Sequence, residues 1–212
     1  MNNCDGKGSE ESRFTDENRN RFKNEYVYWI NDEQNRKMFS SRCWKVIEIR
    51  YASVEEADKI AEIHTSSWRA TYRGILPDQI LDNLDTQKRS AQLKNDINQY
   101  PQLYGIVYKG KEPAGYVSFG RSRDPDSQDT DGEIYAIYLH PQFLNQGIGR
   151  KLFQWSEEEL RKKGYQRIFI WVLEDNLNAR NFYEKHNYQF DGSIKDIRIG
   201  KVLQEIRYLK AI

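Results

Sequence analysis

The spacing of hydrophobic residues changes several times between residue 43 and the end of the chain. Residues 43–50 alternate between apolar and polar positions, which predicts a first strand. Residues 53–64 begin with a Ser-x-x-Glu capping box and continue with apolar residues on one helical face, which predicts a helix. Further helices are predicted over 77–84, where Pro77 marks the start, and over 91–97. The domain therefore starts with a strand followed by helices.

Strand patterns predominate in the next part of the chain. Residues 104–108 and 114–119 flank the turn sequence Lys-Gly-Lys-Glu-Pro, which predicts a hairpin. Beyond it, uniformly apolar runs predict strands covered on both faces, and each is followed by a helical pattern. These elements are strands over 134–139 and 167–173, helices over 146–163 and 178–186, and a last pair of strands within 188–209. Their order predicts an α/β or α+β fold.

Residues 1–43 differ in composition from the rest of the chain. Up to Lys23 they are mainly Gly, Ser, Asn and charged residues, which cannot bury enough apolar area to offset the entropy lost on ordering. An aromatic cluster follows at 26–30. We expect residues 1–43 to form a partly disordered extension and residues 44–212 to form one domain. Met38 stands just before the predicted first strand and is an alternative start site.

The charge balance narrows the range of partners. The 212 residues include 33 Lys and Arg and 32 Asp and Glu, a formal net charge of +1. This balance provides no global field for nucleic acid or for an anionic membrane, so neither is expected as a partner. No apolar run has the length of a spanning helix and the polar N-terminus lacks the centre of a signal peptide, so we expect a cytoplasmic protein. Two cysteines, Cys4 and Cys43, make no framework for disulfides or metal and are expected to be free thiols.

A glycine-rich loop gives the first chemical signal. The sequence Asn-Gln-Gly-Ile-Gly-Arg at 145–150 lies between a predicted strand and a predicted helix. Gly147 and Gly149 would let the backbone approach a ligand, and the unpaired N–H groups of the helix start favour an anion such as pyrophosphate. No Lys-Ser/Thr pair follows, and Leu152 replaces the third glycine of the dinucleotide fingerprint, so neither of those loops is present. The alternative is that the glycines only allow close helix packing.

A second motif occupies residues 171–188 and contains a strand end, a polar turn and a short helix with the sequence Phe-Tyr-Glu-Lys. Together with 145–150 it resembles, in residue type, order and spacing, the GNAT superfamily of acetyl-CoA-dependent N-acetyltransferases. The resemblance covers about 45–212 and is nearest to single-domain bacterial enzymes. It implies a mixed, mostly antiparallel sheet that is splayed after the fourth strand and flanked by helices, with acetyl-CoA in the gap.

The resemblance also assigns residues to the site. Asn176 matches an asparagine that often touches the cofactor, and Tyr183 matches the tyrosine that often protonates the departing thiolate. Glu133 matches the general-base glutamate of the histone acetyltransferase branch. The pyrophosphate loop and the end of the fourth strand imply acetyl-CoA contacts at Ile137, Tyr138, Leu139, Asn145, Gln146, Gly147, Ile148, Gly149 and Arg150.

Three of these residues have a structural alternative. Glu133 is alternatively a solvated carboxylate at a strand start, Tyr183 a packing aromatic, and Asn176 a helix cap. The aspartates of 124–131 form either a solvated loop or a region that attracts a cationic acceptor.

The chain departs from the family at one helix end. Asn187 stands where the family has glycine, and the change is mild because asparagine tolerates the left-handed conformation.

The resemblance implies an acyltransferase that moves acetyl from acetyl-CoA to a primary amine, of a small molecule or a peptide, by direct attack. Glu133 would be the general base and Tyr183 the general acid. The alternative is an acetyl-CoA-binding sensor or scaffold without catalysis, although such a protein needs neither residue. No metal site is expected. The sequence leaves open the identity of the acceptor and the oligomeric state, a homodimer included.

The composition of the N-terminal segment leads to a first prediction. A chain that starts at Met38 should match the full chain in melting temperature and in kcat/KM, because the segment before it contributes no element to the predicted domain. Thermal unfolding and steady-state kinetics of the two chains measure this. A melting temperature lower by several degrees in the shorter chain would show that the aromatic cluster at 26–30 belongs to the core.

Overall fold

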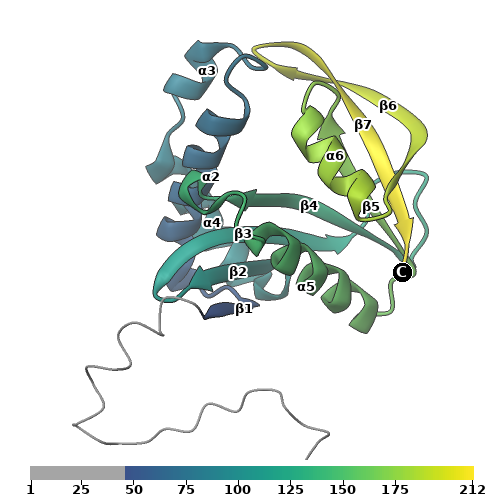
Figure 1. Ribbon diagram of the computed structural model, residues 1–212, viewed down its shortest axis with the longest axis horizontal. Coiled ribbons are helices and arrows are strands. Elements are labelled where there is room, and N and C mark those ends of the chain that lie inside the picture. The colour runs from purple at the N-terminus through teal and green to yellow at the C-terminus, as the bar shows by residue number, and fades with distance from the viewer. Residues whose placement is uncertain (1–45) are drawn as a thin grey trace, which may run out of the picture. The chain divides into compact units, whose positions relative to one another are not determined.

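The computed structural model describes residues 46–212 (Figure 1). The expectations for residues 1–43, including Met38, both cysteines and the cluster at 26–30, lie outside the described residues. The described part contains a seven-stranded sheet with the order β1-β2-β3-β4-β5-β7-β6. The strands are β1 (Ile47–Tyr51), β2 (Tyr104–Lys109), β3 (Glu112–Arg121), β4 (Asp131–Leu139), β5 (Arg167–Leu173), β6 (Gln189–Ile199) and β7 (Lys201–Ala211). The helices are α2 (Ala57–Thr71), α3 (Asp78–Asp82), α4 (Thr86–Gln99), α5 (Ile148–Lys162) and α6 (Leu177–Lys185), with short 3₁₀ turns at Val54–Glu56, Pro101–Leu103 and Pro141–Phe143.

Local signals in the sequence determine most of the element boundaries. The predicted capping box is present, because the N–H of Ser53 donates to the Glu56 carboxylate at 3.0 Å just before α2. Two elements begin earlier than predicted. The Asp85 side chain caps α4 by accepting a hydrogen bond from the N–H of Lys88 at 2.9 Å, so this helix starts well before residue 91. Strand β4 starts at Asp131 because it pairs with β5 there.

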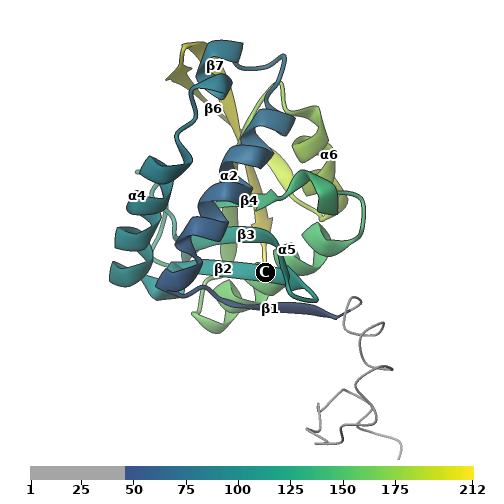
Figure 2. The ribbon, with the colours of Figure 1, turned by 90° about the vertical axis from the view of Figure 1, so that its left-hand side faces the viewer.

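Helices cover both faces of the sheet (Figure 2). Helices α2 and α4 pack on the face to which Ile106 and Tyr116 point, and α5 and α6 pack on the face of Val107 and Val117. These residues alternate because successive side chains of a strand point to opposite faces. A third cluster joins the region around α3 to the end of β5 and the start of β7. None of the helices in the described residues is long and apolar enough to cross a membrane.

Strands β4 and β5 are parallel, and their contact is short. Asp131–Glu133 pairs with Arg167–Phe169, and the pairing stops there. The register of β4 with β3 then leaves Tyr135 as an extra residue in a β-bulge. A bulge bends its strand and increases the local twist, so the two strands separate beyond this point (Figure 1). This arrangement confirms the predicted mixed, mostly antiparallel sheet that splays after the fourth strand.

A half-buried ion pair holds β4 and β5 together where they touch. The fully buried Asp131 carboxylate accepts two hydrogen bonds from the Arg167 guanidinium, both at 2.7 Å, and one from the N–H of Gln128 at 2.7 Å. Burial raises the pKa of Asp131, but the hydrogen bonds from Arg167 and Gln128 outweigh burial and leave this pKa below its ordinary value. The acidic segment 124–131 is therefore not a uniformly solvated loop, although Asp129 within it is exposed.

Replacing Asp131 with asparagine should lower the free energy of unfolding at pH 7 by about 1–3 kcal/mol, because the guanidinium and the N–H lose a charged acceptor. A lowered folded-state pKa means that this contribution is present above the ordinary Asp value of about 3.9 and is lost as the pH falls through the folded value. The two proteins should therefore converge in stability at acid pH. Denaturant unfolding at several pH values measures this.

The control is Asp129→Asn, which removes an exposed partner of Arg121 and should leave the stability unchanged. Equal stability of Asp131→Asn and the unmodified protein at pH 7 would contradict the structural role of the half-buried pair.

Candidate active site

A cavity of about 450 Å³ lies between the separated ends of β4 and β5. This volume is in the range typical of small-molecule sites. Its walls come from the second half of β4, the end of β5, the start of α5, one face of α6, the end of α2 and one residue of β7. The lining includes Ser67, Thr71, Tyr72, Tyr135, Ile137, Tyr138, Leu139, Asn145, Gly147, Gly149, Arg150, Trp171, Leu173, Asn176, Phe182, Tyr183 and Glu205.

The glycine loop forms one end of the cavity. Gly147 is the N-cap of α5 and has a φ of +74°, a left-handed conformation that glycine adopts without strain. A Cβ at this position would project into open space. Among the described residues no side chain caps the start of α5, so the N–H groups of its first turn are available to an anion, and Arg150 adds positive charge. These features fit a pyrophosphate group.

The neighbours of Gly147 have different roles. A Cβ at Gly149 would lie 3.2 Å from Cδ1 of Leu139, so this glycine allows α5 to approach β4, which is the packing alternative. Two residues predicted to contact acetyl-CoA do not line the cavity. The side chain of Ile148 is buried in the core, and that of Gln146 accepts a hydrogen bond from Lys109 at 2.6 Å.

Asn176 caps a helix and also lines the cavity. Its side-chain oxygen accepts a hydrogen bond from the N–H of Ala179 at 3.2 Å, which caps α6. The same residue is largely buried and lines the cavity. The cap alternative is therefore correct, and it does not exclude contact with a ligand. Since the cap fixes where α6 begins, it also fixes the position of Tyr183 on that helix.

Tyr183 lies in the cavity wall with its ring stacked on Phe153, at 5.8 Å between centroids. Burial raises the pKa of the Tyr183 phenol. The phenol is consequently protonated at neutral pH and can donate a proton or a hydrogen bond into the cavity. Tyr183 therefore packs against the core and also lines the cavity.

Glu133 lies beside the cavity and not in its lining. It is the last residue of β4 that pairs with β5, and its neighbour Ile134 lines the cavity. The Glu133 side chain is 3% exposed, and its carboxylate accepts hydrogen bonds from Nη2, Nε and the backbone N–H of Arg123 at 2.6, 3.3 and 3.0 Å. The alternative of a solvated carboxylate is therefore wrong. The guanidinium of Arg123 also stacks on Tyr135, 4.1 Å from the ring centroid.

Sequence reasoning missed two residues on the far side of the cavity. Trp171 on β5 and Glu205 on β7 both line it. Trp171 begins the second motif, but the direction of its side chain follows from the pairing of β5 with β7, which the sequence does not specify. The only signal at Glu205 is a charged residue that interrupts the apolar positions of a predicted strand.

The sequence and this site together define the class of protein. The chain matches the Acetyltransferase (GNAT) family over residues 57–188, a span that contains both motifs and the cavity walls from α2 to α6. The chain belongs to the GNAT acetyltransferase family. The expectation of an N-acetyltransferase is confirmed at the level of the family, and acetyl-CoA as its co-substrate agrees with this family and with solved structures of the same fold that hold coenzyme A or acetyl-CoA.

Particular relatives agree with this class. The N-acetyltransferase YuaI of Bacillus subtilis is 34% identical over 167 residues, which cover 73% of this chain and 92% of the relative. The spermidine N(1)-acetyltransferase of Thermoplasma acidophilum is 25% identical over 147 residues, or 68% of this chain and 89% of that protein. Among solved structures, the PaiA N-acetyltransferase of Thermoplasma acidophilum in complex with coenzyme A has a TM-score of 0.64 at 22% identity, covering 79% of this chain and 99% of its own. YncA of Salmonella typhimurium with acetyl-CoA has a TM-score of 0.59 at 20% identity, covering 78% and 93%.

Replacing Gly147 with tryptophan should abolish the binding of acetyl-CoA, because the new side chain would fill the open space in front of the helix start. Isothermal titration calorimetry measures this, with circular dichroism to verify the fold. Gly164→Trp is a matched control. Gly164 also has a left-handed φ, of +88°, and open space around its Cβ, but it follows the other end of α5. The control should keep its affinity, whereas undiminished affinity in a folded Gly147→Trp protein would rule out the anion site.

Proposed function

We propose that this protein transfers the acetyl group of acetyl-CoA to a primary amine, of a small molecule or a peptide, by direct attack of the amine on the thioester. The observation that carries the proposal is the cavity between β4 and β5, which has an anion-binding helix start at one end and Tyr183 in its wall. Bound acetyl-CoA would supply the activated acyl group. The residues of the chain must then accept a proton from the amine and donate one to the departing thiolate.

Glu133 is the proposed acceptor of the amine proton. An alkylammonium with an ordinary pKa of about 10.4 is protonated at pH 7, and freeing its lone pair costs about 4.6 kcal/mol. Glu133 stands where β4 and β5 part, next to the cavity wall, so it can act directly or through one water. Glu133 is paired with Arg123. Arg123 must therefore move, or let a water pass, before Glu133 can take the proton. The Arg123 side chain is 66% exposed and belongs to the loop between β3 and β4, so its stacking on Tyr135 is the main packing contact that such a movement breaks.

Tyr183 is the proposed donor to the thiolate. Its raised pKa keeps the phenol protonated while the cavity is in use, and its place in the wall gives the hydroxyl access to a ligand. A donor that stabilises negative charge as it develops acts on the transition state and has little effect on ground-state binding. The stacking on Phe153 holds the ring in position.

Glu133→Gln should lower kcat by about 10²–10⁴ at neutral pH and recover part of it as the pH rises, because free amine then accumulates without a base. Tyr183→Phe should lower kcat while the affinity for acetyl-CoA changes little, since the ring and its packing remain. Thiol release from acetyl-CoA with a panel of amines measures both. Spermidine belongs in the panel because one relative is named as a spermidine N(1)-acetyltransferase.

Two variants serve as controls. Glu112→Gln changes an exposed carboxylate of β3, and Tyr188→Phe changes a buried tyrosine whose ring centroid lies 6.3 Å from that of Tyr183 but which does not line the cavity. Both should keep the unmodified kcat. If Glu133→Gln retains kcat/KM from pH 6 to pH 9, another group takes the proton. An absence of thiol release with every amine would favour the acetyl-CoA-binding sensor.

A further inference from the structure

The ammonium group of Lys195, on β6, is held by two residues that line the cavity. It lies 3.7 Å from the ring centroid of Trp171 and 3.2 Å from the Glu205 carboxylate. An aromatic face attracts a cation through its quadrupole, and a carboxylate attracts it through its charge. Trp171 and Glu205 together therefore form a site for an ammonium group, which the chain fills with its own lysine.

Strand pairing places these residues on one face of the sheet. In the antiparallel register of β5 and β7, Trp171 pairs with Arg207 and Glu205 pairs with Leu173. Paired residues share a face, as do residues two positions apart, so Trp171 and Glu205 are diagonal neighbours. Lys195 pairs directly with Glu205 in the register of β6 and β7. The site is built on three adjacent strands and not on a loop.

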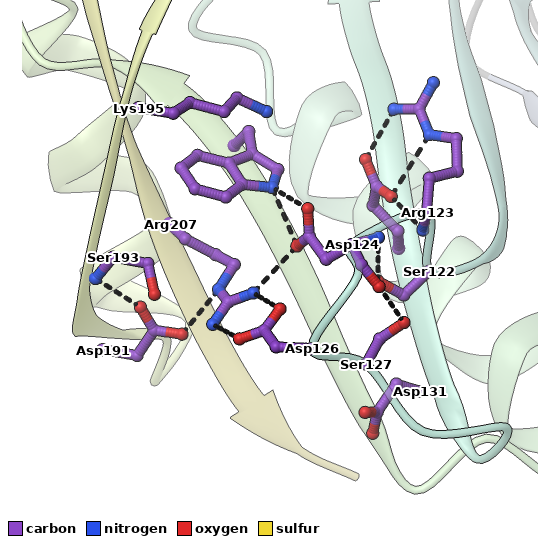
Figure 3. Close-up of polar contacts among 12 residues, drawn as sticks. Ser122, Arg123, Asp124, Asp126, Ser127, Asp131, Asp191, Ser193, Lys195 and Arg207 are labelled. Atoms are coloured by element: carbon purple, nitrogen blue, oxygen red, sulfur yellow. Dashed lines mark hydrogen bonds and ion pairs between the residues drawn. The ribbon is translucent and has the colours of Figure 1, made fainter.

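A network of ion pairs fixes the indole ring of Trp171; Figure 3 labels its members Asp124, Asp126, Asp191 and Arg207. Its Nε1 donates to both carboxylate oxygens of Asp124, at 3.0 and 2.9 Å. The guanidinium of Arg207 donates to Asp124 at 3.0 Å, to Asp126 at 2.7 Å and to Asp191 at 2.7 Å. Three carboxylates around one guanidinium leave an excess of negative charge beside the ring, which favours a cation further.

We propose that Trp171 and Glu205 form a subsite for an ammonium group of the acceptor that does not react, and that Lys195 occupies this subsite until such an acceptor displaces it. The inference rests on the proposed amine acetylation, and it names the acceptor class as amines that carry a second cationic group. The subsite stabilises the protonated form of its ligand, whereas the attacking nitrogen must lose its proton. The two requirements are opposite, so the bound ammonium and the reacting amine are different nitrogens of the acceptor.

The test compares 1,4-diaminobutane with butylamine, which share the reacting end and differ in the second ammonium group. Thiol release from acetyl-CoA gives kcat/KM for each. Lys195→Met should raise the ratio of kcat/KM for the diamine over the monoamine by about 3- to 10-fold, through a lower KM for the diamine, because the internal competitor is removed. Glu205→Gln should lower the same ratio by about as much, through a higher KM.

Matched controls separate the subsite from a general charge effect. Lys201→Met on β7 changes the net charge as Lys195→Met does, and Glu112→Gln on β3 changes it as Glu205→Gln does. Both controls are at exposed positions and should leave the ratio unchanged. Calorimetric titration of 1,4-diaminobutane gives a readout without turnover. The affinity for the diamine should be higher in Lys195→Met and lower in Glu205→Gln than in the unmodified protein. A ratio and an affinity that change in neither Lys195→Met nor Glu205→Gln would overturn the subsite. Absent thiol release from the unmodified protein with every amine would instead overturn the proposed function, and the calorimetric arm would still decide the subsite.

Discussion

The short contact between β4 and β5 is the constraint on which the site depends. The two strands pair over Asp131–Glu133 and Arg167–Phe169 and then separate. The ion pair of the buried Asp131 with Arg167 fixes the point of contact, and the bulge at Tyr135 turns β4 away beyond it. If β4 and β5 stayed paired, the backbone N–H and C=O groups on this edge of β4 would bind those of β5. They would then no longer face the cavity. An interrupted sheet therefore provides the cavity and keeps its two walls in one domain.

The two ends of this cavity have opposite electrostatic character, and each arises from a different level of structure. The end near Gly147 is favourable to anions because of a local feature, the uncapped start of α5, with Arg150 beside it. At the end near Trp171 and Glu205, the pairing of β5, β6 and β7 places an aromatic face beside a carboxylate, and both contact the ammonium group of Lys195. Under the proposed function this polarity suits an anionic acyl donor and a cationic acceptor that enter from separate sides.

The sequence could predict the features that depend on neighbours along the chain. The capping box before α2, the hairpin of β2 and β3, and the loop at 145–150 are short-range patterns, and all are present. Asn187 has a φ of +65°, so the expectation that asparagine replaces glycine at the end of α6 is confirmed. The loop also shows the limit of such patterns. Gly147 and Gly149 look alike in the sequence, yet one adopts a left-handed conformation and the other allows packing on Leu139.

Side-chain contacts that depend on the register of distant strands could not be predicted. Asp124 and Asp126 lie 83 and 81 residues from Arg207, the arginine of β7 that binds both. A row of aspartates in a loop has the same appearance in a sequence whether water or a guanidinium surrounds it. In this chain the distinction depends on the register of β5 with β7, which places Arg207 opposite Trp171 and so draws the loop over the indole. Without that register the segment would be the solvated loop of the alternative interpretation, and Trp171 would lack the hydrogen bonds that fix its ring beside Glu205.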